Sequence, residues 1–412
     1  MKYTIVAALT SAFVIPSEAH SSTLRCALPQ PQALLVQDPA TCPSTNIRKT
    51  NHTEPEPEVK FSDPIWAHAP HCFDGREKQY CTHTTNQFLE GGLSIIATSD
   101  AASEASKVFS RARTSQYYIH PDLEVQDIPG KGKGLVAKKE LKKGTVVMVD
   151  AARIITSSKL PFSVTADQGI TLMNSAVHRL PEKDKEMVLD LDKSAGGTGI
   201  DDILKTNSFA CQFRDGSEGD GEGEGYLCLF PQVSRINHAC RPNTNAKFIP
   251  ATLTMEIKTL RTIPAGEELS ISYGRLELLH QERQDLYRDG WHFTCTCSLC
   301  SANTYAIAGS DQRRQRFKQL REKLGALTAE TFDSQQVIAW EKEVLEISEK
   351  EGFETLVGED LERLAYVYSG LGRRTEAVMW AKRARRNLES WVVVEGGWNL
   401  EAERVEGLLG EL

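Results

Sequence analysis

The chain has 412 residues, 40% of them hydrophobic, and a formal net charge of −8 at pH 7. The length predicts two or three domains, since one domain commonly takes about 100–200 residues. The acidic balance argues against a large DNA-binding face, and we find no nucleic-acid-binding motif. An acidic surface could still attract a basic protein partner.

The first 19 residues have the pattern of a secretory signal peptide. Lys2 is followed by a short, mostly apolar run over 3–15, and Ser17-Glu18-Ala19 supplies small residues for cleavage. The run is too short for a membrane anchor, which needs about 20 apolar residues, and no later stretch approaches that length. We therefore expect a secretory or extracellular protein. A frayed N-terminus on a nuclear or cytoplasmic protein is the alternative.

Residues 20–116 form a Pro-rich, Cys-containing N-terminal segment. Its prolines interrupt any long periodic element, so a loop-like segment is expected. Its four cysteines, behind a signal peptide, predict two disulfides with three possible pairings, or else four unpaired thiols. They are Cys26, Cys42, Cys72 and Cys81. Asn51-His52-Thr53 is an N-glycosylation triplet, which agrees with the secretory route.

From residue 117 the pattern becomes one of short strands, turns and helices, which predicts an α+β class. Helical periodicity occupies 163–205, and the acidic, Gly-rich run at 215–225 is typical of a solvated loop. Strand-like segments occur before and after these stretches. They lie at 118–127, 135–137, 145–149, 227–230, 245–249, 254–257 and 268–273.

The last hundred residues, 310–412, are predicted to be helical. Amphipathic spacing indicates helices at 311–325, 335–350, 358–370 and 374–390. Small and aromatic residues in this region match one tetratricopeptide helix pair, and such a tail could bind a protein partner. A helical bundle that packs on the preceding domain and walls a groove is the interpretation we favour.

Three motifs along the chain could carry chemistry, although each alone has a structural explanation. The turn at 130–134 alternates Gly with Lys, so its backbone could approach a ligand closely. The stretch 235–243, Arg-Ile-Asn-His-Ala-Cys-Arg-Pro-Asn, offers side chains suited to an adenine edge. The stretch 266–274 places Tyr273 at the end of a strand. The alternatives are a hairpin turn, a structural histidine and a core tyrosine.

A fourth motif is a cysteine cluster. Cys295, Cys297 and Cys300 lie within six residues and cannot easily form disulfides with one another. Three thiolates at this spacing suit a tetrahedral zinc, with Cys240 as the candidate fourth ligand. Four protein ligands leave no position for water, so such a zinc is structural. A Cys-rich disulfide knot is the alternative.

Taken together, these motifs resemble the SET domain of protein lysine methyltransferases, followed by a post-SET zinc loop. Asn237 to Asn243 and Glu268 to Gly274 carry the resemblance, which covers roughly 118–301. It is nearest to the fungal-type and MYND-associated branches. The MYND zinc finger is absent, since 150–235 contains only Cys211 and Cys228.

The resemblance implies a β-rich SET domain at 117–274 with a variable insert at about 155–225, a post-SET zinc cluster at 286–301, and a threaded, pseudoknot-like segment. S-adenosylmethionine and a protein lysine enter such a domain from opposite faces. Tyr273 is the expected catalytic residue, and 207–209 the expected edge of the pocket. The expected cofactor-binding residues are Lys133, Gly134, Arg235, Asn237, Phe293 and His238, the last largely through its backbone.

The resemblance implies a lysine methyltransferase that acts on a histone or on another protein. Two other hypotheses remain at this stage. One is a non-catalytic SET scaffold that binds proteins, against which the intact Asn237, His238 and Tyr273 argue. The other is a secreted effector methyltransferase, which the signal-like N-terminus favours and the reduced zinc cluster opposes.

Overall fold

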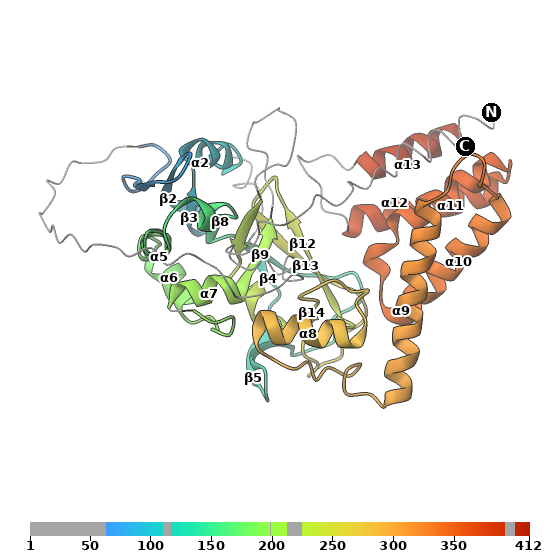
Figure 1. Cartoon of the computed structure of the whole chain (residues 1–412), viewed down its shortest axis with the longest axis horizontal. Coiled ribbons are helices and arrows are strands. Elements are labelled where there is room, and N and C mark those ends of the chain that lie inside the picture. The colour runs from blue at the N-terminus through green and yellow to red at the C-terminus, as the bar shows by residue number, and fades with distance from the viewer. Residues whose placement is uncertain (1–62, 110–116, 198, 212–224, 392–399) are drawn as a thin grey trace, which may run out of the picture.

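A computed structural model describes residues 63–109, 117–197, 199–211, 225–391 and 400–412 (Figure 1). Strands dominate the N-terminal two thirds of this part, and helices form its C-terminal third. The predicted α+β class is therefore confirmed. The signal-like segment, Cys26, Cys42 and the glycosylation triplet lie outside the described residues.

A six-stranded sheet has the order β1-β2-β3-β8-β10-β9. Its strands are β1 (His71–Asp74), β2 (Gln79–Phe88), β3 (Gly91–Ala97), β8 (Ile154–Ser157), β9 (Ser208–Cys211) and β10 (Tyr226–Leu229). The first three correct the expectation of a loop-like segment, because the prolines end at Pro70 and β-branched and apolar residues follow. Strand β3 pairs in parallel with β8, so this N-terminal segment belongs to the main sheet.

Two disulfides staple neighbouring strands of this sheet. Cys72 on β1 is bonded to Cys81, its direct partner on β2. One pairing that the sequence left open is thereby settled. Cys211 on β9 is bonded to Cys228 on β10, a disulfide that the sequence analysis did not predict. Their separation of 17 residues gives no local signal, since only the β9–β10 pairing brings them together.

Short helices cover the six-stranded sheet. They are α2 (Ser99–Ser106), α4 (Leu160–Ser163), α5 (Ala166–His178), α6 (Glu182–Leu189) and α7 (Ile200–Asn207). The last four largely confirm the helical stretch predicted at 163–205. Helix α5 begins at a capping box, in which Thr165 and Gln168 satisfy each other's backbone N–H. Its apolar face packs on β2 and β3, in a buried cluster that also contains residues of β8 and β10.

The remaining strands form three small sheets. Their strands are β4 (Tyr118–Ile119), β5 (Leu123–Ile128), β6 (Gly132–Ala137), β7 (Val146–Ala151), β11 (Asn237–His238), β12 (Thr244–Ile249), β13 (Thr254–Thr259) and β14 (Ser270–Ile271). The four-stranded sheet has the order β12-β13-β7-β4, and β5–β6 and β11–β14 are pairs. Gly130 and Gly132 have positive φ and close the β5–β6 turn. The strand predicted at 268–273 is regular only at 270–271.

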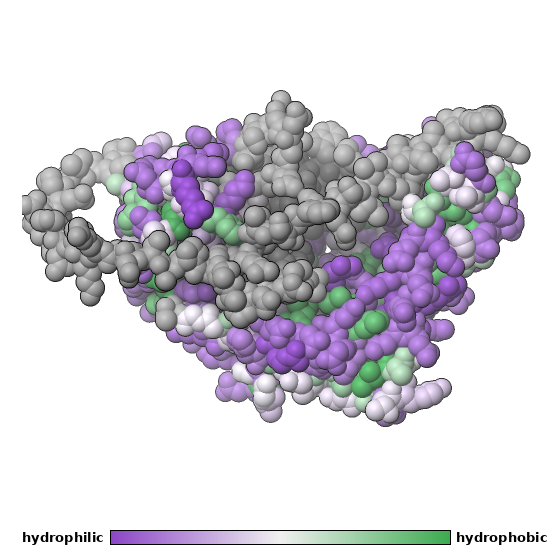
Figure 2. Space-filling model, in the orientation of Figure 1, coloured by the Kyte–Doolittle hydropathy of each residue, from purple (hydrophilic) through white to green (hydrophobic). Residues whose placement is uncertain are grey.

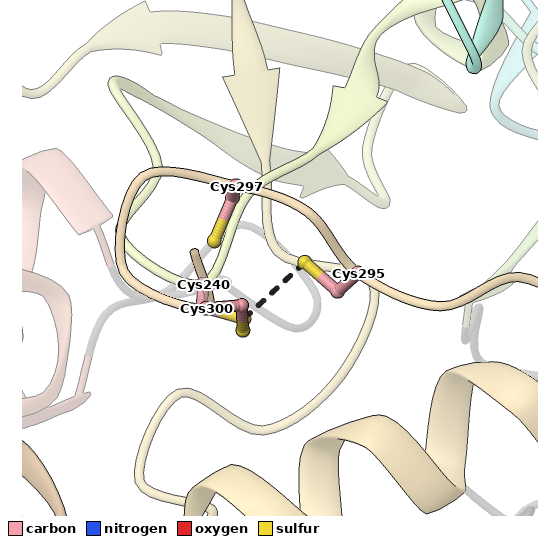
Figure 3. A group of neighbouring side chains, drawn as sticks. All are labelled: Cys240, Cys295, Cys297 and Cys300. Carbon is pink, nitrogen blue, oxygen red and sulfur yellow. Dashed lines mark hydrogen bonds between the residues drawn. The ribbon is translucent and has the colours of Figure 1, made fainter. Parts of the chain in front are cut away.

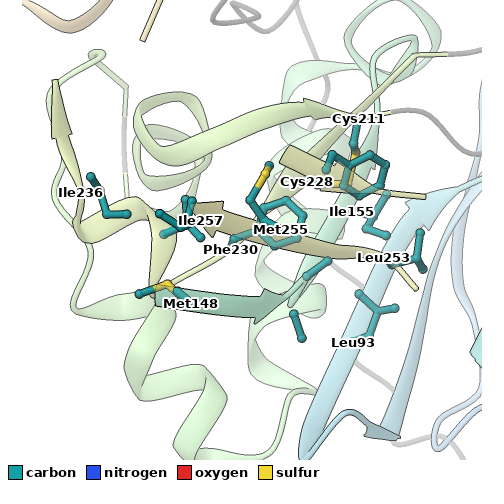
Figure 4. Close-up of a cluster of buried hydrophobic side chains, with 14 of the residues drawn as sticks. Leu93, Met148, Ile155, Cys211, Cys228, Phe230, Ile236, Leu253, Met255 and Ile257 are labelled. Carbon is teal, nitrogen blue, oxygen red and sulfur yellow. A yellow bond between two sulfur atoms is a disulfide. The ribbon is translucent and has the colours of Figure 1, made fainter. Parts of the chain in front are cut away.

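The main core lies between the six-stranded and four-stranded sheets (Figure 4). Leu93 and Ile155 come from the first sheet, and Met148, Met255 and Ile257 from the second. The Cys211–Cys228 disulfide is buried in the same cluster. The core thus fixes the two sheets against each other, and the segments between their strands carry the site.

After α8 (His280–Trp291) the chain continues into a helical tail. Its helices are α9 (Thr304–Gly325), α10 (Ser334–Glu351), α11 (Gly358–Gly370), α12 (Arg374–Trp391) and α13 (Leu400–Glu411), with a 3-10 turn η2 (Glu354–Leu356). The four helices predicted here are confirmed. The tail has a core of its own, and hydrophilic residues cover most of its visible face (Figure 2). No helix in the described part of the chain is both long and apolar enough to cross a bilayer.

The tail is attached to the small sheets by lysines. The ammonium of Lys247 on β12 donates to the carbonyl of Glu389 near the C-terminus of α12, at 2.9 Å. This position suits a cation, because the helix end presents unpaired carbonyl groups. Lys258 on β13 lies 5.3 Å from the ring of Trp391, and Lys143 pairs with Glu354 of η2 at 2.7 Å. The tail therefore packs on the strand-rich body as a bundle, as expected.

Candidate active site and cysteine cluster

The two polar motifs found in the sequence lie side by side. Strand β11, which is Asn237–His238, pairs in parallel with β14. Asn243 fastens the pair, because its side-chain oxygen accepts the N–H of Ser270 at 2.7 Å and its amide donates to the carbonyl of Glu268 at 2.8 Å. Residues separated by about 30 positions in the sequence therefore share one rigid centre.

Tyr273 is held at this centre by two hydrogen bonds. Its hydroxyl donates to the carbonyl of Ile236 at 3.0 Å, and its backbone N–H donates to Nδ1 of His238 at 3.1 Å. Burial, with the nearby carboxylates of Asp192 and Glu268, raises the pKa of the Tyr273 phenol. The hydroxyl therefore stays protonated near neutral pH and acts as a hydrogen-bond donor.

Four of the predicted cofactor residues gather on the β5–β6 hairpin side of this centre. Asn237 donates to the carbonyl of Lys133 at 3.2 Å and to Glu268 at 2.8 Å. A Cβ on Gly134 would lie 2.9 Å from the Asn237 amide, so this position requires glycine. The carboxylate of Asp190 accepts from Lys133 at 2.7 Å and from Arg235 at 2.5 Å. The hydrogen bond from Lys133 and the charge of Arg235 lower the pKa of Asp190.

Aromatic rings enclose the other side of His238. Tyr287 on α8 lies 4.1 Å from the imidazole between ring centroids. Phe293, the fifth predicted neighbour of the cofactor, stacks on Tyr287 at 5.4 Å and lies 6.2 Å from His238. Trp291 lies 5.5 Å from Tyr273 and donates its indole N–H to the carbonyl of Thr206. The end of α8 therefore forms an aromatic wall over His238 and Tyr273.

The four cysteines predicted as a metal site converge (Figure 3). Their sulfur atoms all lie within 4.8 Å of one another, with Cys240 at 3.5 Å from Cys300 and 3.8 Å from Cys295. Tetrahedral zinc with Zn–S bonds of about 2.3 Å requires sulfur separations of about 3.8 Å. None of the four forms a disulfide, which excludes the disulfide-knot alternative. The cluster could hold zinc.

A cavity of about 470 Å³ opens beside Tyr273. Tyr273 and Trp291 line it together with 207–209, the residues expected at the edge of the pocket. Thr355 and Leu356 of η2 complete the wall, and the sequence analysis did not identify them. No local motif marks these two residues, since they reach the cavity only because the tail packs on the body.

Asp150 on β7 is a further positioning residue that the sequence analysis missed. Its carboxylate accepts the backbone N–H groups of Gln232 at 2.7 Å and Val233 at 3.1 Å. These groups begin the 3-10 turn η1 (Val233–Arg235), which leads directly into β11. A single aspartate within a strand carries no sequence signal for such a role.

The charge of Asp150 should make stability depend on pH. Burial raises its pKa to about 6, despite the hydrogen bonds from Val233 and Gln232 and the charge of Arg153. In the unfolded chain an aspartate has a pKa of about 3.9, so the folded protein binds this proton more tightly than the unfolded chain does. The stabilisation that results is complete below about pH 4 and is lost as the pH rises through about 6. Relative to Asp150→Asn, the wild type should lose on the order of 3 kcal/mol of unfolding free energy between pH 4 and 7. Urea unfolding across this range measures the difference, and parallel pH profiles of the two proteins would contradict it.

Comparison with known proteins agrees with this geometry. The SET domain family matches residues 132–274. Histone-lysine N-methyltransferase set5 of Schizosaccharomyces pombe is 28% identical over 193 residues, which cover 47% of this chain and 54% of set5. Protein-lysine N-methyltransferase SMYD4 of Homo sapiens is 25% identical over 176 residues, which cover 41% of this chain and 20% of that protein. The matched region thus spans about half of set5 and less of SMYD4. Residues 132–274 form a SET domain, and over this region the chain is similar to SET-domain lysine methyltransferases.

Proposed function

We propose that this protein is an S-adenosylmethionine-dependent protein-lysine N-methyltransferase. The observation that carries the proposal is the position of Tyr273, which hydrogen-bonds His238 of the Asn237–His238 strand and also lines the cavity. Such a residue can touch a cofactor and a substrate side chain at once. The names of the relatives, histone-lysine and protein-lysine N-methyltransferases, support the same reaction class.

The residues near Asn237 suit the proposed cofactor. Arg235 has a buried Nη1 with no hydrogen-bond partner among the described residues, so a donor is available to a ligand carboxylate. The Asn237 amide packs against Gly134 and donates to Lys133 and Glu268, so its oxygen is the atom left to accept from the amino group of an adenine. Lys133, His238 through its backbone, and Phe293 complete the proposed set. The cofactor would supply the methyl group as an electrophilic carbon on a sulfonium.

The cavity would admit the lysine of a protein substrate, a histone tail or another exposed segment. The lysine must arrive as a neutral amine, so its ammonium proton leaves to solvent first. The amine then attacks the methyl carbon, and the N–C bond forms as the C–S bond breaks, with the electron pair staying on sulfur. The Tyr273 hydroxyl, kept protonated by burial, would orient the amine, and the faces of Tyr273 and Trp291 suit the cationic product.

We further propose that the cysteine cluster is a structural zinc site of post-SET type. Four thiolates around Zn²⁺ carry a net charge of −2, which needs compensation in a buried place. The buried guanidinium groups of Arg283 and Arg314 would supply it: the charge of Arg283 interacts with Cys240 and Cys300, and Arg314 donates to the carbonyl of Cys240 at 3.3 Å. The β11–β14 pairing, closed by this loop, is our candidate for the threaded, pseudoknot-like segment.

Calorimetric titration of the zinc-loaded full chain with S-adenosylmethionine tests the enzyme proposal. Asn237→Ala should abolish binding, because it removes an amide that also holds Glu268. Tyr273→Phe should keep binding but slow methyl transfer to a protein panel that includes histones by about tenfold to a hundredfold, through lost alignment.

Tyr305→Phe is the matched control, since Tyr305 is 88% exposed and should change neither quantity. A folded wild type that binds no cofactor would overturn the enzyme proposal and leave the protein-binding scaffold.

The two disulfides support the hypothesis that this methyltransferase is a secreted protein. Cys72–Cys81 and Cys211–Cys228 would not persist in a reducing compartment, whereas zinc-bound thiolates resist oxidation. We propose maturation in the secretory pathway, with removal of residues 1–19. N-terminal sequencing of the secreted protein tests this, and an uncleaved protein with eight or more free thiols would contradict it.

A further inference from the structure

The side chain of His238 makes two polar contacts that its expected backbone role does not use. Its Nδ1 accepts the N–H of Tyr273 at 3.1 Å, and its Nε2 lies 3.3 Å from Sγ of Cys240. A backbone N–H can only donate, so Nδ1 carries no proton. In the neutral ring the hydrogen therefore sits on Nε2 and points at the sulfur.

The imidazole has no room to turn away from these partners. It is 5% exposed and lies against the ring of Tyr287 at 4.1 Å, with Tyr273 at 5.5 Å. The backbone beside it is held as well, because the N–H of Ala239 donates to the carbonyl of Ile271 at 2.9 Å. Both ring nitrogens are thus occupied, which removes His238 from consideration as a general base.

We propose that the imidazole of His238 is a positioning residue that links the Cys240 thiolate of the metal cluster to the backbone of Tyr273. The link rests on the proposed zinc site and on the proposed role of Tyr273. An N–H···S⁻ hydrogen bond stabilises the thiolate as a ligand, as outer-shell partners of metal ligands commonly do. At the other end, the ring fixes the Tyr273 N–H and thereby the direction of the phenol. Metal binding and the geometry of methyl transfer are therefore coupled through one side chain.

Two substitutions separate the two ends of this link. In His238→Asn, the amide oxygen can take the place of Nδ1 and accept the Tyr273 N–H, but the side chain is too short to reach Cys240. In His238→Gln, the longer side chain can present an N–H to Cys240, and no acceptor stands where Nδ1 was. The variant His238→Asn should weaken zinc binding, and the variant His238→Gln should increase the mobility of the Tyr273 backbone.

The test measures both ends in the full chain. His238→Asn should weaken zinc by about tenfold to a hundredfold in competition with a chelator and shift the thiolate-to-metal band of the Co²⁺-loaded protein. His238→Gln should keep zinc, speed hydrogen exchange at the Tyr273 amide, and lower kcat by about tenfold with little change in the KM for substrate. His120→Asn and His120→Gln are the controls, since Nδ1 of His120 also accepts a backbone N–H, from Asp122 at 3.2 Å.

The proposal fails if the two His238 variants change metal affinity and Tyr273 exchange to the same extent, or if neither variant changes either. It also fails if the wild type binds no zinc. An inactive wild type that binds zinc would instead refute the methyltransferase proposal alone, because the chelator and exchange measurements need no activity.

Discussion

At the proposed zinc site, replacing Cys297 with serine or adding a chelator should unfold the aromatic wall over His238 and Tyr273. The wall belongs to a small buried cluster that contains the four cysteines, Tyr287 and Trp291, so few other contacts hold it. Structural zinc contributes about 10–16 kcal/mol to the folding of small zinc domains, more than such a cluster supplies. Hydrogen exchange should accelerate over residues 286–303, and binding of S-adenosylmethionine should be lost.

The two larger cores should survive this change, because they contain none of the four cysteines. Far-ultraviolet circular dichroism should therefore fall only slightly. Ser298→Ala is the matched control, since Ser298 is an exposed residue of the same loop. A melting curve and exchange pattern unaffected by both the chelator and Cys297→Ser would show that the cluster does not depend on metal.

Arg314→Gln should destabilise the protein by about 3–5 kcal/mol, because it breaks a fully buried ion pair. Arg314 on α9 pairs with Glu351 at 3.1 Å, and both side chains have no exposed area. Its guanidinium also donates to the carbonyls of Leu276, Leu278 and Cys240, so it joins the tail to the residues around the cluster. Arg313 still pairs with Glu351 at 2.7 Å, which favours the lower end of the range.

Urea unfolding of the full chain measures this effect in the first transition. Arg316→Gln is the control on the same helix: its partner Glu343 is 39% exposed, so the loss should stay below about 1 kcal/mol. Arg314→Gln should also raise the KM for a protein substrate, since the cavity wall at Thr355 and Leu356 depends on the docked tail. Equal losses of unfolding free energy in Arg314→Gln and Arg316→Gln would contradict this prediction, because the buried ion pair would then stabilise the protein no more than the exposed one.

Local patterns in the sequence were enough to predict most secondary structure after residue 117. The tail helices follow amphipathic spacing, and the strands of the SET domain follow short β-branched runs between turns, because both depend on neighbouring residues. The N-terminal strands were not predicted, because the prolines of this segment indicated a loop. The alternation of residue types over 79–97 indicates strands only once β3 is seen to pair with β8.

The sequence by itself determined which chemical groups are present: the Asn237–His238 and Tyr273 motifs and the four clustered cysteines. The tertiary structure alone decided how distant residues meet. It paired Cys211 with Cys228, placed Asp150 beneath η1, put Thr355 and Leu356 on the cavity, and set His238 between Cys240 and Tyr273. These contacts depend on strand register and on the packing of helices against distant parts of the chain. Neither can be predicted from the residues that neighbour each position in the sequence.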